Sequence, residues 1–150
     1  MLKQPSLFSL TLLFITALMS KSYAAEPINA TWFGNLAIEG YDSVAYFTEN
    51  RAIEGSEEFQ IEWNNANWRF SSAENLALFE EDPEKYSPQY GGYCAWAVSN
   101  NRLAEIDPEQ FHLHDDKLYL NYNARVQELW LPEKLERIGR ADANYPGLVD

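Results

Sequence analysis

The sequence contains a single cysteine, Cys94, within the stretch YGGYCAWAVS at residues 90–99. A thiol can act as a nucleophile, a metal ligand or a redox group, although free cysteine is also among the residue types most often buried in cores. Because the chain has no second cysteine, an intramolecular disulfide is excluded. Three interpretations of Cys94 stay open: a buried unreactive thiol, a ligand or reactive thiol beside a pocket, and an intermolecular disulfide.

The two histidines, His112 and His114, are separated by one residue in a segment that has the pattern of a strand. Residues i and i+2 of a strand point to the same side, so both imidazoles could reach one ion. Together with Cys94 they would suit copper or zinc. The next residues, Asp115 and Asp116, indicate a turn, where exposed polar side chains are ordinary. A histidine metal site and a solvated strand face are therefore both possible.

Several tyrosines and small residues have the composition of a pocket wall. The candidate ligand-binding residues are Tyr41, Asp42, Tyr46, Tyr90, Gly91, Gly92, Tyr93 and Cys94. Such aromatic residues either line a pocket or belong to a core, and the sequence leaves both open. The acidic residues have no recognisable catalytic spacing, and the chain has no Gly-rich phosphate loop and no Ser/His/Asp order. We therefore expect no catalytic residues and no conventional hydrolase.

Two hairpins and two further strands are expected to position these residues. FQIEW, at residues 59–63, alternates apolar and polar residues and is followed by a turn and a second strand. FHLHDDKLYLNY, at residues 111–122, predicts another hairpin with the paired aspartates at its turn. We also expect a strand-like start at residues 45–47. YCAWAV, at residues 93–98, predicts a buried strand with Cys94 and Trp96 on one face.

The remaining segments have helical patterns. Ser71 and Glu74 form a capping-box pattern, which predicts a helix that ends at Asp82-Pro83, with Pro83 opening a further short turn. Residues 123–146 predict a helix that is broken near Pro132, with Leu135 and Ile138 on its apolar face. The fold class is therefore α+β, a small antiparallel sheet packed with several helices in a single compact domain.

The first 24 residues have the pattern of a secretory signal peptide: a basic start, a short apolar run and small residues before a cleavage point after Ala24. We expect export to the periplasm or outside the cell, and no stable membrane span once the leader is removed. Cleavage would remove Lys3 and Lys21 and change the net charge from −12 to −14. Such an acidic protein repels phosphate backbones, so nucleic acid is excluded as a partner.

Several stretches together resemble the YHS domain family, specifically its exported stand-alone members. They are GYDSVAYF, WRFSSAENLALFEEDPEKYSPQYGGYCAWAVS, DDKLYLNYN and ADANYP. The resemblance covers most of residues 25–150 and implies one small α+β domain. Its core would span about residues 40–99, and residues 100–150 would add a C-terminal hairpin and helices.

The resemblance also implies where a metal would bind in relatives that carry cysteines. Those relatives have cysteines in patterns like Asp-Pro-Val-Cys and Phe-Cys-Ser-x-x-Cys, and the matching positions here are Ala45, Ser71 and Asn75. Alanine has no donor atom, and serine and asparagine are poor ligands for a soft metal. We therefore expect no metal at these three positions, which leaves His112 and His114 as the remaining metal candidates.

Three functions stay in competition. The first is an exported binding module for a metal ion or an unknown small ligand in the cell envelope. The second is a thiol-based redox protein or enzyme that uses Cys94. The third is an interaction domain whose partner is another envelope protein. Nothing in the sequence selects a ligand, and no cofactor other than that metal ion is expected.

Overall fold

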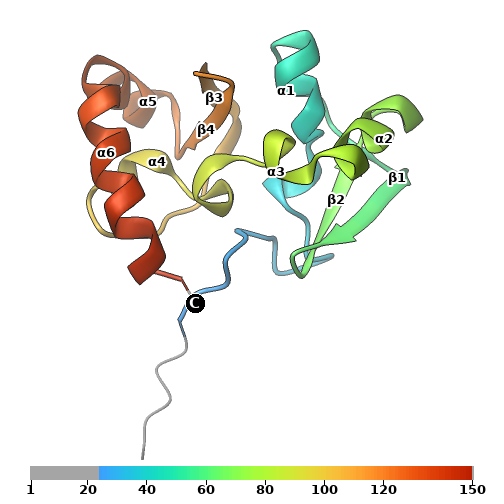
Figure 1. Ribbon diagram of the computed structural model, residues 1–150, viewed down its shortest axis with the longest axis horizontal. Helices are drawn as coiled ribbons and strands as arrows, with labels where there is room; N and C mark the ends of the chain where they lie inside the picture. Colours follow the sequence, from blue (N-terminus) through green and yellow to red (C-terminus); the bar gives the residue numbers. More distant parts are fainter. Residues whose placement is uncertain (1–23, 150) are drawn as a thin grey trace, which may run out of the picture.

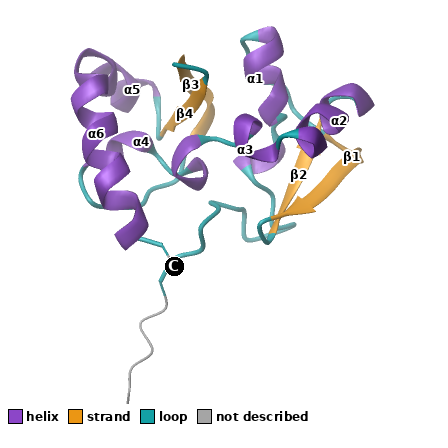
Figure 2. Cartoon of the chain, in the orientation of Figure 1, coloured by secondary structure: helices purple, strands orange, loops and turns teal. Residues whose placement is uncertain are grey.

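The computed structural model describes residues 24–149, so the predicted signal peptide lies almost wholly outside the described residues. The strands are β1 (Ser56–Trp63), β2 (Ala66–Phe70), β3 (Asp107–His114) and β4 (Lys117–Asn121). The helices are α1 (Ser43–Glu49), α2 (Ala73–Glu81), α3 (Pro83–Tyr86), α4 (Ala95–Ser99), α5 (Ala124–Trp130) and α6 (Lys134–Asn144). Figures 1 and 2 show α1, α2 and β1–β2 in one half of the molecule and α4–α6 with β3–β4 in the other.

Both predicted hairpins are confirmed, and they form two separate two-stranded antiparallel sheets. The β1–β2 turn places Asn64 and Asn65 at φ +48° and +60°, and the β3–β4 turn places Asp115 and Asp116 at +49° and +56°. Asn and Asp tolerate this left-handed region because their short polar side chains bond locally. Two successive left-handed residues match the twist of a tight hairpin. The α+β class is therefore confirmed, with two hairpins in place of one sheet.

Strand β4 separates two apolar clusters. Leu118 and Leu120 pack into the larger cluster with Trp68 and Phe79, whereas Tyr119 packs into the smaller one against Trp130. The Tyr119 and Trp130 ring centroids are 5.5 Å apart. Alternate residues of a strand face opposite sides, so one short strand serves both clusters. The two halves seen in Figure 1 are thereby joined in one domain.

Two of the strands expected from the sequence are helices. Residues 45–47 belong to α1, because the Asp42 side chain caps the backbone N–H groups of Val44 and Ala45 at 2.9 and 3.1 Å. Residues 95–98 belong to α4, whose first bond runs from the Val98 N–H to the Cys94 carbonyl oxygen. A short continuous apolar run has the same pattern in a buried helix as in a buried strand, which explains this error.

The helical predictions were otherwise close. The cap of α2 is Ser72, which accepts from the Asn75 N–H at 3.1 Å, and not the predicted Ser71. Pro83 opens α3 as predicted, and a 3₁₀ turn at Leu131–Glu133 interrupts the C-terminal helix near Pro132. Ile138 packs in the smaller cluster, but Leu135 is 69% exposed, so its predicted place on a buried face was wrong. No helix within residues 24–149 is long and apolar enough to cross a bilayer.

The N-terminal segment, which begins at residue 24, joins the two halves of the molecule. It packs against the turn formed by Gly91 and Gly92. The Asn29 N–H donates to the Gly91 carbonyl oxygen at 2.9 Å, and the Tyr145 hydroxyl donates to the carbonyl oxygen of Pro27. In Figure 1 this blue segment runs from the end of α6 to the β1–β2 turn. Gly91 has φ +60°, and a Cβ there would lie 1.8 Å from the Pro27 oxygen. Only glycine allows the two backbones to approach so closely.

We expect Gly91→Ala to lower the free energy of unfolding by roughly 2–4 kcal/mol, because the added methyl group displaces the N-terminal segment and strains a left-handed residue. Gly139→Ala is the matched control, since nothing lies within 4 Å of a Cβ at that position of α6. That change should stabilise by about 0.5–1 kcal/mol, because alanine is the better helix former. Urea unfolding measures both. Equal effects of the two substitutions would contradict the close approach.

Candidate functional site

The Asp42 side chain is fully buried and accepts five hydrogen bonds. Besides the two from the start of α1, its Oδ2 accepts from the Ser71 N–H at 2.8 Å, the Ser71 hydroxyl at 2.7 Å and the Asn75 amide at 2.7 Å. A buried carboxylate is costly unless its oxygens are hydrogen-bonded. Asp42 meets that condition with donors from α1, α2 and the end of β2. It therefore joins three elements and has no face open to a ligand.

The three positions that the family resemblance aligns with metal-binding cysteines meet at this carboxylate. The Ala45 N–H, the Ser71 hydroxyl and the Asn75 amide all donate to Asp42. Their polar groups are thus used within the chain as donors toward one side chain. Among residues 24–149, no group of three or more His, Cys, Asp and Glu side chains is placed to hold a metal ion. This arrangement gives the three positions a structural role.

We expect Asp42→Asn to destabilise the protein by roughly 2–4 kcal/mol, because the new amide nitrogen would face at least two donors whichever way it turns. Asp82→Asn is the matched control. Asp82 is an exposed cap that accepts from the Lys85 N–H at 3.1 Å, and asparagine caps a helix as well as aspartate. Thermal unfolding compares the two variants. A small loss at Asp42 equal to that at Asp82 would show that the buried network contributes little.

The predicted pocket wall is divided between separate parts of the fold. Tyr46 is buried in the larger cluster and donates to the Pro108 carbonyl oxygen at 2.9 Å, while Tyr41 is half-buried beside the same cluster. Tyr90 lies in the smaller cluster and donates to Asp142 at 2.8 Å. Burial, followed by this hydrogen bond, raises the pKa of Tyr90. The hydroxyls of Tyr46 and Tyr90 are therefore engaged within the chain.

Gly91, Gly92 and Tyr93 bind the N-terminal segment. The Tyr93 hydroxyl donates to the Glu26 carbonyl oxygen at 3.0 Å, and the Asn29 side-chain amide donates to the Gly92 carbonyl oxygen at 3.3 Å. The backbone that the sequence suggested as a ligand-binding turn thus binds residues of its own chain. Tyr93 nevertheless lines an open groove on its other side, together with Glu26 and Asn29.

The two histidines lie on the same face of β3, as the strand periodicity predicts. Their ring centroids are 6.5 Å apart and nearly parallel, and His112 also packs edge-on against Trp130 at 5.7 Å. The pKa of His112 is lowered, mainly by burial and further by the charges of Lys134 and His114. His114 lies 3.4 Å from the Asp115 carboxylate. Cys94 does not lie beside the two histidines. It belongs to the larger cluster, and its sulfur contacts the side chain of Asn121.

Cys94 is 1% exposed and lies at the base of a mainly apolar pocket of about 270 Å³. The lining residues are Cys94, Trp96, Ala97, Arg102, Leu103, Ala104, Tyr122 and Val126. The Cys94 Sγ is 3.8 Å from Asn121 Oδ1, and its N–H donates to the Ala104 carbonyl oxygen at 3.0 Å. Burial raises the pKa of the thiol despite nearby backbone hydrogen bonds that lower it.

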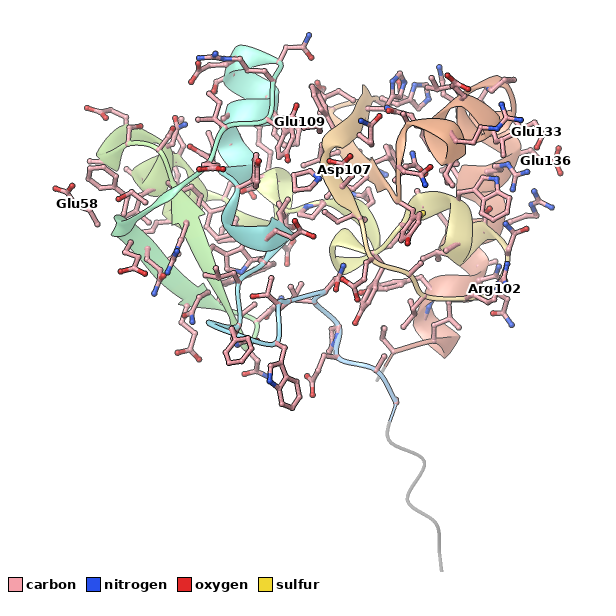
Figure 3. All side chains as sticks on the ribbon, turned by 180° about the vertical axis from the view of Figure 1, so that it is seen from behind. Glu58, Arg102, Asp107, Glu109, Glu133 and Glu136 are labelled. Carbon is pink, nitrogen blue, oxygen red and sulfur yellow. The ribbon has the colours of Figure 1, made fainter. Side chains whose placement is uncertain are left out.

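Arg102 is the charged residue of this pocket, which we call the Cys94 pocket. Every other arginine within residues 24–149 is paired with a carboxylate: Arg51, Arg69, Arg125, Arg137 and Arg140. Arg102 has no such partner in that range, although the protein carries 23 acidic residues. In Figure 3 it projects from the loop after α4, on the same side as Glu133 and Glu136, which pair with arginines of α6.

The sequence predicted that Cys94 and Trp96 lie together, but it gave no sign that Arg102, Tyr122 and Val126 belong to the same pocket. Strand periodicity placed Trp96 beside Cys94 for the wrong reason, since both belong to the start of a helix. Arg102 had no motif around it, and only the packing of α5 beside α4 brings Val126 to the same pocket. The pocket is therefore a product of tertiary structure.

Comparison with known proteins found no matching family model, no matching curated protein and no matching solved structure.

We expect Cys94 to react slowly with iodoacetamide in the native protein and rapidly after denaturation, because only a small fraction of a buried thiol is the reactive thiolate. Cys94→Ser should destabilise by about 1–3 kcal/mol, since it places a hydroxyl without an assured partner in the core. Mass spectrometry of quenched samples gives the labelling rates. Equal rates in the two states, with Cys94→Ser fully stable, would instead indicate an accessible thiol.

Proposed function

We propose that this protein is an exported binding module whose ligand is a small molecule with an apolar body and an acidic group, held in the Cys94 pocket. The unpaired Arg102 at a mainly apolar pocket carries the proposal. In a protein of net charge −12, carboxylates are abundant and pair with the other described arginines. A guanidinium left free beside apolar side chains matches a ligand that combines both properties.

Two further donors lie near the pocket but are closed off from it. The Trp96 indole N–H and the Asn121 side-chain amide have no acceptor among the described residues, and both nitrogens are buried. Trp96 lines the pocket with other atoms, whereas Asn121 does not line it. Arg102 is therefore the charged donor that the Cys94 pocket offers to a ligand.

The raised thiol pKa favours binding over thiol chemistry. A nucleophilic or redox cysteine needs a lowered pKa and access to its partner, and Cys94 is 1% exposed. Cys94 then acts as part of the pocket wall. The second function considered from the sequence, a thiol-based redox protein, is less well supported by the burial and raised pKa of Cys94.

The place of the protein in the cell rests on its sequence. The leader-like residues 1–24 support export, and the stretches that resemble YHS domains support membership of the exported stand-alone members of that family. The Asp42 network at the three positions aligned with cysteines suits a member whose ligand is not a metal bound there. We propose an envelope protein that binds its small ligand elsewhere, in the Cys94 pocket.

Isothermal titration calorimetry with three matched probes tests the proposal: octanoate, octan-1-ol and octylamine. Octanoate should bind most tightly, because it alone adds a negative group to the common apolar chain. Arg102→Gln should weaken octanoate about fivefold and leave octan-1-ol unchanged, since one exposed charge-assisted contact is lost.

Arg125→Gln is the control, because Arg125 is equally exposed on α5 but is paired with Glu128 at 3.4 Å. This variant should bind octanoate like the wild type. Octylamine binding as tightly as octanoate, or an Arg102 variant with unchanged octanoate affinity, would overturn the proposed ligand class.

A further inference from the structure

A second surface, which shares no residue with the Cys94 pocket, exposes two large aromatic residues. Trp32 is 92% exposed and its neighbour Phe33 is 85% exposed. They occupy the turn between Ala30 and Ala37, which pair as an isolated antiparallel bridge. Burying such side chains stabilises a folded protein, so adjacent exposed rings leave that stabilisation unused. Single apolar residues scattered over a surface are ordinary, but two adjacent exposed aromatic rings require an explanation.

The exposure is imposed by a rigid backbone. The Thr31 hydroxyl donates to the Phe33 carbonyl oxygen at 2.6 Å and accepts from the Leu36 N–H at 3.0 Å. The Asn67 amide of β2 donates to the Gly34 carbonyl oxygen at 2.8 Å. Gly34, at φ +77°, completes the turn. These contacts anchor the turn to β2 and hold both rings away from the core.

Beside this turn lies an open groove of about 540 Å³ that is rich in hydrogen-bond acceptors. Its polar lining consists of Glu26, Asn29, Asn35, Asn64, Asn65, Tyr93 and Glu105, without any lysine or arginine. Glu26 and Glu105 are exposed and have no ion-pair partner within residues 24–149. The groove therefore collects two unpaired carboxylates beside several amides.

The amide orientations reinforce this acceptor character. The Asn29 side-chain NH₂ donates to the Gly92 carbonyl oxygen and the Asn35 side-chain NH₂ donates to the Asn65 carbonyl oxygen. Both Oδ1 atoms are left without a donor among the described residues. The charges of Glu105 and Glu26 also act on Tyr93, whose pKa is raised first by burial and then by these carboxylates. Both acidic residues line the groove together with Tyr93.

Such a set of acceptors matches a group that only donates. Lysine and arginine side chains carry three and five donors and no acceptor, and arginine also stacks on exposed aromatic rings. A cation placed near Trp32 or Phe33 would gain a cation–π contact, while an apolar neighbour would cover the rings. The turn and the groove thus offer complementary halves of one recognition surface.

We propose that the Trp32–Phe33 turn and the adjoining acceptor groove form a docking surface for a basic segment of a partner protein. A lysine or arginine of the partner enters the groove between Glu26 and Glu105. An apolar or arginine side chain next to it covers Trp32 and Phe33. The net charge of −12 favours such a partner and repels both a second copy of this chain and an anionic lipid surface.

Selection from a random peptide library, followed by affinity measurement of the enriched peptides on the full chain, tests this proposal. Enriched sequences should combine lysine or arginine with an apolar residue. Their affinity should fall at least tenfold, or about 1.4 kcal/mol, in the double variant Trp32→Ser/Phe33→Ser. Glu105→Gln should weaken binding about threefold and reduce its dependence on salt, because one exposed charge is removed.

Glu58→Gln is the matched control, since Glu58 is an exposed acid at the end of β1 that lies away from the Asn64-Asn65 turn. It should bind the peptides like the wild type. Circular dichroism should show every variant folded, because the substituted side chains are exposed.

The proposal would be overturned by a library without enriched basic peptides, by peptide affinity that is unchanged in the aromatic variant, or by Trp32-dependent dimerisation in analytical ultracentrifugation. Trp32-dependent sedimentation with phosphatidylcholine vesicles would also overturn it, because a lipid surface would then be the occupant.

Discussion

The hydrogen bonding of Asp42 is the constraint on which the N-terminal half of the structure depends. A carboxylate at 0% exposure needs donors on both oxygens, and here these donors come from α1, α2 and the end of β2. The Asp42 carboxylate caps the start of α1 with its Oδ1, and its Oδ2 holds Asn75 in the first turn of α2. Satisfying one buried side chain therefore places three elements, and Trp68 and Phe79 pack in the cluster that they enclose.

A second constraint joins this half to the rest. Strand β4 contributes to both apolar clusters through its alternating faces, and the N-terminal segment crosses Gly91 at a distance that admits no Cβ. Three of the tyrosines that the sequence suggested as a pocket wall, Tyr46, Tyr90 and Tyr93, donate their hydroxyls to groups of the chain itself. The buried hydroxyls of Tyr46 and Tyr90 are thereby satisfied within the fold.

The two surfaces proposed to take ligands have opposite chemistry. The Cys94 pocket combines apolar area with the unpaired Arg102, whereas the groove beside Trp32 collects unpaired acceptors. Coulomb attraction would therefore direct an acidic ligand to the first and a basic segment to the second.

The sequence by itself determined the elements that depend on local chemistry. Left-handed Asn and Asp pairs specify the two hairpin turns, Pro83 starts a helix, and strand periodicity places His112 beside His114. Tertiary structure decided the rest. The apolar run at residues 95–98 forms a helix that its pattern alone did not distinguish from a strand, and Arg102 and Val126 share a pocket only through packing of α5. The helix at residues 45–47 is different, because its cap, Asp42, is local and could have been recognised in the sequence. Periodicity records which side of an element is buried, whereas a pocket or a buried network depends on contacts between residues far apart in the chain.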